Sequence, residues 1–204
     1  MNPLFENNTI ILNLPDAEIE YTPTFFSEKE AKILFEELLA TVPWQQDIIT
    51  IFGKNYNQPR LTCFYGDFGL QYTYSGITMN AIPWNKTISE IKQRVENHTQ
   101  QTYNSVLINL YRDGKDSNGW HADDEKTLGQ NPVIASISLG EKRPFQLKHK
   151  IDSTVKKTIE LESGSLLLMK GTTQHYWKHQ IPKTVKPINP RINLTFRTIF
   201  QNKM

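Results

Sequence analysis

Two residue types with metal-binding chemistry lie two positions apart in the segment His121-Ala122-Asp123. In an extended strand, residues i and i+2 point to the same face, so this imidazole and this carboxylate can bind one metal ion. The third ligand must come from elsewhere, and the downstream histidines are His149, His175 and His179. Two histidines and one carboxylate on one face of an octahedral ion leave the other positions open, as in non-haem Fe(II) oxygenases. The spacing therefore indicates a metal site with room for a cosubstrate and oxygen.

A second chemical pattern lies between Arg191 and Arg197, where polar and apolar side chains alternate. In a strand, one face would be apolar and the other would carry Arg191, Asn193, Thr195 and Arg197. Two guanidinium groups beside an amide and a hydroxyl can hold a dianion through bidentate pairing. An amphipathic strand with both arginines in solvent is the alternative interpretation.

Asn109 and Tyr111 repeat the two-residue spacing in a β-rich run that ends just before His121. On one strand, their amide and phenol groups would point the same way. Tyr111 could equally fill the hydrophobic core.

These segments together resemble the AlkB family of Fe(II)- and 2-oxoglutarate-dependent dioxygenases, which remove alkyl groups from nucleic-acid bases. The resemblance covers the chain from about Ile48 to Phe200, and the joint presence of His-X-Asp and the arginine-rich strand makes it more specific than either motif alone. The subgroup that the chain resembles most acts on duplex DNA. The matching stretches are Pro59-Arg60, Tyr65-Gly66-Asp67, Tyr72-Thr73-Tyr74-Ser75-Gly76, Asn109-Leu110-Tyr111-Arg112-Asp113-Gly114, His121-Ala122-Asp123-Asp124-Glu125, Gly164-Ser165-Leu166-Leu167 and Arg191-Ile192-Asn193-Leu194-Thr195-Phe196-Arg197.

The resemblance implies a double-stranded β-helix, that is, a cupin-like jelly roll, with iron at its mouth. In the family's pattern the distal histidine lies 12 residues before the first arginine, which selects His179 and leaves His175 as the second choice. His121, Asp123 and His179 would then bind Fe(II) and form the catalytic centre.

The resemblance also assigns the residues that would bind the cosubstrate. Arg191 would pair with the distal carboxylate of 2-oxoglutarate, Asn109 and Arg197 would hold the end that chelates iron, and Tyr111 would donate a hydrogen bond. Asn193 would lie beside them. With O2, the implied reaction oxidises an N-methyl group of bases such as 1-methyladenine or 3-methylcytosine and releases formaldehyde, which repairs DNA by direct reversal.

A base stacked in a duplex cannot reach an iron inside a barrel, so the enzyme must flip it out or act on single strands. The resemblance implies that Phe52 fills the gap left by the flipped base as an apolar wedge; a hydrophobic strand end is the alternative. Tyr74 and His121 would sandwich the base. Further substrate contacts would come from Tyr72, Ser75 and Glu125, and the carboxylate of Glu125 would accept from an exocyclic amine.

The elements that must position these residues follow from capping and periodicity. Ser27-Glu28-Lys29-Glu30 and Thr87-Ile88-Ser89-Glu90 both predict capping boxes that begin helices. From Asn104 onward the pattern changes to short β-rich runs separated by turn residues, which predicts a β barrel or sandwich. The predicted strands are 105–112, 133–139, 145–149, 158–161, 165–170 and 191–200, preceded by 48–52 and 70–74, with 52–57 as a hairpin loop.

The predicted fold is therefore mainly β with N-terminal helices, in a single dioxygenase domain over residues 1–204. Residues 1–103 would form a helical layer and nucleotide-recognition hairpins, and residues 104–204 the catalytic β-helix core.

Composition bounds the class of protein. A hydrophobic fraction of 38% and a charged fraction of 22% predict a folded, soluble protein rather than a disordered or collagen-like one. The single cysteine, Cys63, excludes an internal disulfide and a thiolate zinc site. We expect an intracellular monomer without membrane contact, cytoplasmic if the source is bacterial and nuclear if it is eukaryotic.

Charge is divided unevenly along the chain. Residues 1–140 contain 10 Lys+Arg against 17 Asp+Glu, and residues 141–204 contain 13 against 4. The basic C-terminal third could bind the phosphates of alkylated DNA, with RNA as an alternative partner, or could simply be a solvated surface.

Other functions remain compatible with the same residues. Within the superfamily, the alternatives are an RNA demethylase or a protein hydroxylase. Outside it, the alternatives are a non-catalytic cupin-like module that binds metal or nucleic acid, and a zinc hydrolase with the same three ligands. A binding module needs no cosubstrate arginines, and the production of succinate distinguishes the oxygenase from the other two.

Overall fold

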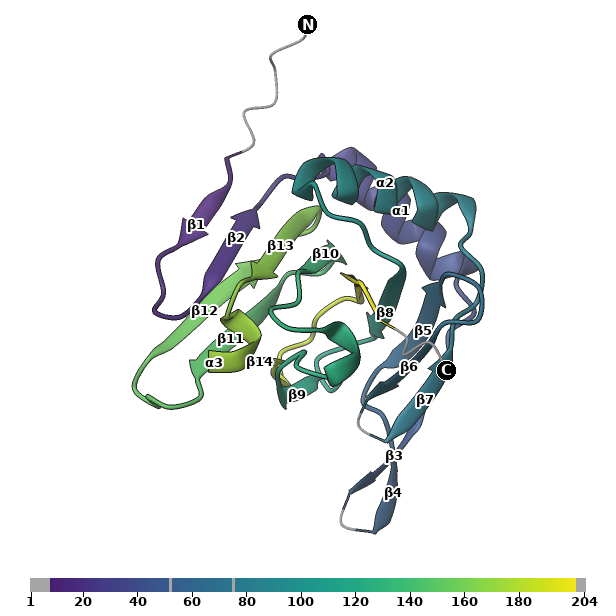
Figure 1. Ribbon diagram of the computed structural model, residues 1–204. Helices are drawn as coiled ribbons and strands as arrows, with labels where there is room; N and C mark the ends of the chain where they lie inside the picture. Colours follow the sequence, from purple (N-terminus) through teal and green to yellow (C-terminus); the bar gives the residue numbers. More distant parts are fainter. Residues whose placement is uncertain (1–7, 52, 75, 201–204) are drawn as a thin grey trace, which may run out of the picture.

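A larger and a smaller antiparallel sheet pack face to face, and two helices cover the outer face of the larger sheet (Figure 1). This computed structural model describes residues 8–51, 53–74 and 76–200. Within these ranges, the larger sheet has the strand order β1-β2-β13-β10-β15-β8-β5. Its strands are β1 (Ile10–Leu12), β2 (Glu18–Thr22), β13 (Ser165–Lys170), β10 (Ile134–Gly140), β15 (Arg191–Arg197), β8 (Ser105–Tyr111) and β5 (Leu61–Gly66).

The smaller sheet has the order β12-β11-β14-β9, and two hairpins, β3-β4 and β6-β7, lie outside both sheets. In Figure 1 the β3-β4 hairpin projects away from the body of the molecule. The bounds are β12 (Lys156–Leu161), β11 (Arg143–His149), β14 (Trp177–Ile181), β9 (Asn118–His121), β3 (Ile48–Ile51), β4 (Lys54–Asn57), β6 (Gln71–Tyr74) and β7 (Ile77–Asn80). The short helices η1 (Lys126–Leu128) and α3 (Thr173–Tyr176) follow β9 and β13.

The larger sheet is buried on both faces, and the two faces have different chemistry. Its outer face packs against α1 (Glu28–Thr41) and α2 (Lys86–Thr99) through an apolar layer that includes Ile137, Ile192 and Leu194. Its inner face carries a second apolar cluster shared with the smaller sheet, and in β15 this face is polar. The alternation predicted for residues 191–197 is thus confirmed, with both arginines buried rather than in solvent.

Both predicted helices form, but only one of the two predicted capping boxes does. The Ser27 hydroxyl accepts from the Glu30 amide and the Glu30 carboxylate accepts from the Ser27 amide, which forms the predicted capping box of α1. The cap of α2 is instead Asn85, whose Oδ1 accepts from the Ile88 amide at 2.9 Å. The Thr87 hydroxyl is engaged elsewhere, because it donates to the Glu37 carboxylate of α1.

The β-rich runs predicted after residue 104 form strands whose ends differ by a few residues from the prediction. The predicted hairpin loop over residues 52–57 is wrong for 54–57, which form β4. The prediction also missed β1, β2, β5, β7, β9 and β14. In β5 the sequence shows no alternation because residues 62–66 are all buried, so the period-two signal is absent.

Residues 1–103 contribute more than helices and hairpins to the fold. From this segment, β1, β2 and β5 join the larger sheet, where β2 pairs with β13 and β5 pairs with β8. Among the described residues, no helix is long and apolar enough to cross a membrane.

Replacing Asn85 by alanine removes the side-chain cap of α2, so we expect the free energy of unfolding to fall by about 1 kcal/mol. The matched control is Glu90→Ala, which removes the predicted but unformed end of the box; Glu90 is exposed and lies 3.9 Å from Lys86. That change should stay within about 0.5 kcal/mol. Urea denaturation of both variants measures the difference, and an equal loss for Glu90→Ala would show that the predicted box operates in solution.

Candidate active site

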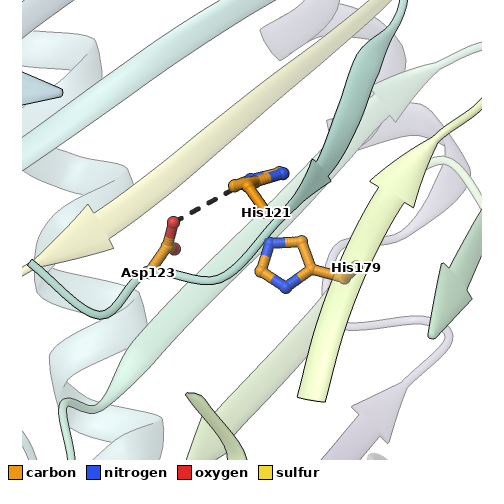
Figure 2. A group of neighbouring side chains, drawn as sticks. All are labelled: His121, Asp123 and His179. Atoms are coloured by element: carbon orange, nitrogen blue, oxygen red, sulfur yellow. Dashed lines mark ion pairs between the residues drawn. The ribbon is translucent and has the colours of Figure 1, made fainter. Parts of the chain in front are cut away.

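Strand register brings the predicted metal ligands together. His121, the last residue of β9, is the register partner of His179 on β14, and Asp123 follows β9 by two residues. The potential ligand atoms of all three lie within 4.8 Å of one another, and Figure 2 shows their side chains converging. The two imidazole rings are 4.2 Å apart between centroids, and His121 Nε2 is 3.9 Å from Asp123 Oδ1. The donor set of two imidazoles and one carboxylate fits Fe(II).

The other two downstream histidines lie elsewhere. His175 is exposed on α3, where its Nε2 is 2.9 Å from Asn131 Oδ1. His149 is buried on β11, lies 3.4 Å from the Asp16 carboxylate, and accepts a hydrogen bond from the Asp152 amide through Nδ1. Among the described residues, the geometry favours His179 over both as the third ligand.

The two ligand histidines are held in fixed orientations. His121 Nδ1 lies 2.7 Å from the Gly119 carbonyl, and the Phe145 ring stacks on His179 with centroids 5.0 Å apart. Burial lowers the pKa of His179 to about 3 and also lowers the pKa of His121. Both imidazoles are therefore neutral near pH 7, which is the form that binds a metal ion.

Asp123 is tied to the larger sheet by a buried ion pair. Arg197 Nη2 donates to Asp123 Oδ2 at 2.8 Å, and Arg197 Nε lies 3.3 Å from the same oxygen. Burial by itself raises the pKa of Asp123, but the charge of Arg197 and the neighbouring histidines lower it to about 2. The backbone amide of Asp123 donates to Gln174 Oε1 at 2.9 Å. The carboxylate is thus ionised and fixed, with Oδ1 turned toward His121.

Arg191 provides a buried site for an anion. Its side chain is 1% exposed, its Nη2 donates to Ser138 Oγ at 2.8 Å, and its Nε and Nη1 have no hydrogen-bond partner in the described part of the chain. Burial lowers the pKa of Arg191 to about 10, so the group is still cationic at pH 7. Two unpartnered donors on a buried guanidinium match a carboxylate of 2-oxoglutarate.

The other predicted cosubstrate residues surround this guanidinium. In strand register, Arg191 is opposite Tyr111 and Asn193 is opposite Asn109. Asn193 Nδ2 donates to Ser136 Oγ and to the Ile137 carbonyl at 2.8 and 2.9 Å. Asn193 therefore links β15 to β10 and lies beside the groups that would donate to the cosubstrate.

One cavity of about 170 Å³ is lined both by the metal ligands and by the residues predicted to bind the cosubstrate. Its walls hold the three metal ligands and all five predicted cosubstrate residues. They are His121, Asp123, His179, Asn109, Tyr111, Arg191, Asn193 and Arg197. Metal and anion could therefore be bound in contact with each other.

The predicted base contacts are described only in part. Tyr72 and Glu125 line the same cavity and share a hydrogen bond, in which the Tyr72 hydroxyl donates. Glu125 Oε2 is buried without a partner in the described residues, and burial raises the pKa of Glu125. Phe52 and Ser75 lie outside the described residues, and for Tyr74 only the backbone, paired with Ile77, is described.

Sequence reasoning missed two residues that hold the site. Arg60 is buried in the cavity wall, where its Nε donates to Asn109 Oδ1 at 2.8 Å, and Gln174 supports Asp123. Arg60 lies in a stretch that resembles the AlkB family, which was the available signal for it. Gln174 carries no such signal, because its contact spans 51 residues.

Comparisons with known proteins agree with this geometry. The family model of the 2OG-Fe(II) oxygenase superfamily matches residues 18–197. Alpha-ketoglutarate-dependent dioxygenase alkB homolog 3 of Homo sapiens is 44% identical over 187 residues, covering 87% of this chain and 65% of that protein. DNA oxidative demethylase ALKBH2 of Homo sapiens is 40% identical over 197 residues, covering 91% and 75%. The chain thus spans slightly less than two thirds of the alkB homolog 3 relatives.

A solved structure, that of OsALKBH1, superimposes with a TM-score of 0.65 at 15% sequence identity and covers 93% of this chain and 100% of that chain. At this identity the likeness concerns the fold, and with the family match it confirms the predicted jelly-roll core.

His121→Ala, Asp123→Asn and His179→Ala should each weaken Mn(II) binding, measured by calorimetry, at least 10-fold, because each removes one of three protein ligands. His175→Ala is the matched control and should bind Mn(II) like the unchanged protein. If His175→Ala loses the metal and His179→Ala keeps it, the ligand assignment is wrong.

Proposed function

This chain belongs to the 2OG-Fe(II) oxygenase superfamily and, within it, to the AlkB family, and on that premise we propose that it removes alkyl groups oxidatively from the bases of DNA. The observation that carries the proposal is the joining, in one cavity, of a His-Asp-His cluster and a buried guanidinium with two unpartnered donors. Two relatives of the chain carry names that describe dioxygenase or DNA demethylase activity.

We propose the following roles for the metal and cosubstrate residues. His121, Asp123 and His179 hold Fe(II), and Arg191 donates through Nε and Nη1 to the distal carboxylate of 2-oxoglutarate. When bound, iron, 2-oxoglutarate and O2 supply the oxidising equivalents that hydroxylate the alkyl carbon. Asn109 accepts from Arg60 through Oδ1, so its amide nitrogen is the group left to donate to the cosubstrate.

For Arg197 we propose a role in addition to the predicted one of holding the end of 2-oxoglutarate that chelates iron. It pairs with Asp123 and its Cζ lies 5.5 Å from the centre of the Tyr72 ring. We propose that it keeps Asp123 ionised and oriented and joins the metal ligands to the wall that faces the base. Its pKa is raised, because the attraction of Asp123 exceeds the opposing effect of burial.

The base would enter beside Tyr72 and Glu125. Glu125 Oε2 is a buried acceptor without a partner among the described residues, and the exocyclic amine of adenine or cytosine is a donor of matching chemistry. Once the methyl carbon is hydroxylated, the product on a ring nitrogen is unstable and loses formaldehyde, which leaves the base intact.

We also propose that the protein works inside the cell and as a monomer. All the residues assigned to metal and cosubstrate come from one chain, so the site requires no second copy. Size-exclusion chromatography with light scattering tests the oligomeric state.

The proposed function is tested by incubating the protein with Fe(II), ascorbate, 2-oxoglutarate and oligonucleotides that contain 1-methyladenine or 3-methylcytosine. Mass spectrometry should show loss of the methyl group, with succinate and formaldehyde in equal amounts. Single-stranded DNA, duplex DNA and RNA are separate arms, so the preferred nucleic acid is measured in the same experiment. Absence of succinate with every substrate would refute the proposal and leave a binding module or a zinc hydrolase.

Arg191→Ala should raise the KM for 2-oxoglutarate by about 30- to 5000-fold, since losing a buried charge-assisted pair costs roughly 2 to 5 kcal/mol. Arg191→Lys should recover only part of the loss, because an ammonium group cannot reproduce the guanidinium fork. Steady-state kinetics at saturating methylated DNA measure both variants. An unchanged KM in Arg191→Ala would remove Arg191 from the cosubstrate site.

For Phe52 the proposal rests on the resemblance alone. If Phe52 fills the gap left by a flipped base, Phe52→Ala should lose repair of duplex DNA and keep repair of single strands, since only the duplex requires unstacking. The melting temperature should barely change, whereas truncating a core phenylalanine costs about 3 to 5 kcal/mol. Equal loss on both substrates with a lowered melting temperature would identify Phe52 as a core residue.

A further inference from the structure

A second guanidinium group, that of Arg143, is buried behind the cosubstrate site. Arg143 is 1% exposed at the start of β11, and it does not line the active-site cavity. Its Nη atoms donate only to backbone carbonyls, and its Nε has no partner among the described residues. A buried cation without a carboxylate partner is costly, so this arrangement calls for an explanation beyond stability.

The carbonyls that Arg143 binds belong to two loops of the active site. Arg143 donates to Asp113 O at 3.3 Å and Asp116 O at 3.0 Å, in the β8-β9 loop, and to Pro182 O at 2.7 Å, in the β14-β15 loop. The first loop leads from the strand of Asn109 and Tyr111 to the strand of His121. The second leads from the strand of His179 to Arg191.

The two loops also meet each other directly. The Thr184 amide donates to the Gly114 carbonyl at 2.8 Å, and a Cβ on Gly114 would collide with the backbone of Thr184. Arg143 therefore closes a tightly packed contact between the two chain segments that connect metal ligands to anion donors.

Arg143 also contacts a residue assigned to the cosubstrate. Its Cζ lies 5.6 Å from the centre of the Tyr111 ring, and the Cζ of Arg191 lies 5.3 Å from the same ring. Two cations thus share one aromatic ring, which is a favourable contact for each of them. Three acids lie near Arg143: Asp116 is already paired with Arg112 at 2.8 Å, and neither Asp113 nor Glu141 forms an ion pair with Arg143 in the described part of the chain. The positive charge on this side of the cavity is not neutralised by the pairs described.

We propose that Arg143 is a positioning residue for the dicarboxylate cosubstrate, which it serves by fixing the Tyr111 ring and clamping the β8-β9 and β14-β15 loops around the anion site. This inference rests on the proposed function, because it presupposes that the cavity binds 2-oxoglutarate. Arg143 acts through Tyr111 and the loops, and its positive charge adds to that of Arg191 in favouring a doubly charged ligand. The mutual repulsion of the two cations is relieved when a dianion binds.

The test is calorimetric binding of 2-oxoglutarate to the Mn(II)-loaded protein, which requires no turnover. Arg143→Lys keeps the charge but cannot reach three carbonyls, and it should raise the Kd for 2-oxoglutarate at least 10-fold while leaving the Kd for methylated DNA unchanged. The matched control is Arg94→Lys, since Arg94 also donates to a backbone carbonyl, that of Phe25 at 2.7 Å, but on α2. It should change neither Kd.

A double-mutant cycle distinguishes positioning from general stabilisation. If Arg143 acts through Tyr111, Arg143→Lys and Tyr111→Phe should be non-additive in the Kd for 2-oxoglutarate. In turnover, Arg143→Lys should raise the KM for 2-oxoglutarate far more than it lowers kcat. Additive effects, or an Arg143→Lys variant that binds 2-oxoglutarate normally, would overturn the inference.

The unchanged protein provides a second test that does not depend on the folding of a variant. Addition of 2-oxoglutarate should slow hydrogen exchange of the backbone amides in residues 113–117 and 183–184, with the β3-β4 hairpin as internal control. Unchanged exchange in both loops while 2-oxoglutarate is bound would refute the clamp. If the unchanged protein binds no 2-oxoglutarate, the proposed function itself fails, which is a different result.

Discussion

The buried ion pair between Asp123 and Arg197 is the interaction on which the arrangement of the site depends. Asp123 follows a strand of the smaller sheet, and Arg197 ends a strand of the larger one, so the pair spans the two layers. Removing one partner of a buried pair costs about 3 to 5 kcal/mol, because the other charge is left without compensation. The pair keeps Asp123 ionised and leaves Oδ1 on the side of His121, so a structural contact also prepares a metal ligand.

The polar face of β15 likewise combines structural contacts with groups that can bind a ligand. Burial of these side chains is possible because each is bonded: Arg191 and Asn193 donate to Ser138 and Ser136 within the sheet, and Arg197 pairs with Asp123 across the two layers. Among the described residues that line the cavity, the exceptions are Nε and Nη1 of Arg191 and Oε2 of Glu125. Buried polar groups without partners are rare in native proteins and concentrate at functional positions. Ligands that bind these unpartnered groups should therefore stabilise the folded protein.

How much the sequence could predict depended on the range of the interaction. The His-X-Asp spacing and the alternation from Arg191 to Arg197 are local, and the structure places both as predicted. The choice between His175 and His179 needed the resemblance, because four residues separate them and only the β9-β14 register distinguishes them. The Asn85 cap was missed because the competing contact of Thr87 is to another helix. Arg143 and Gln174 act across long separations that no local pattern reveals.

The two halves of the site come from different sheets, so the packing of the sheets sets the distance between the metal ligands and the anion donors. The histidine pair lies in the smaller sheet, and the anion donors lie in the larger one. Between the sheets lies an apolar cluster that includes Leu107, Leu147 and Met169. Because interiors are close-packed, this cluster fixes the separation of the sheets, and with it the distance from metal to anion. The site thus depends on both sheets, since neither sheet alone contains both the metal ligands and the anion donors.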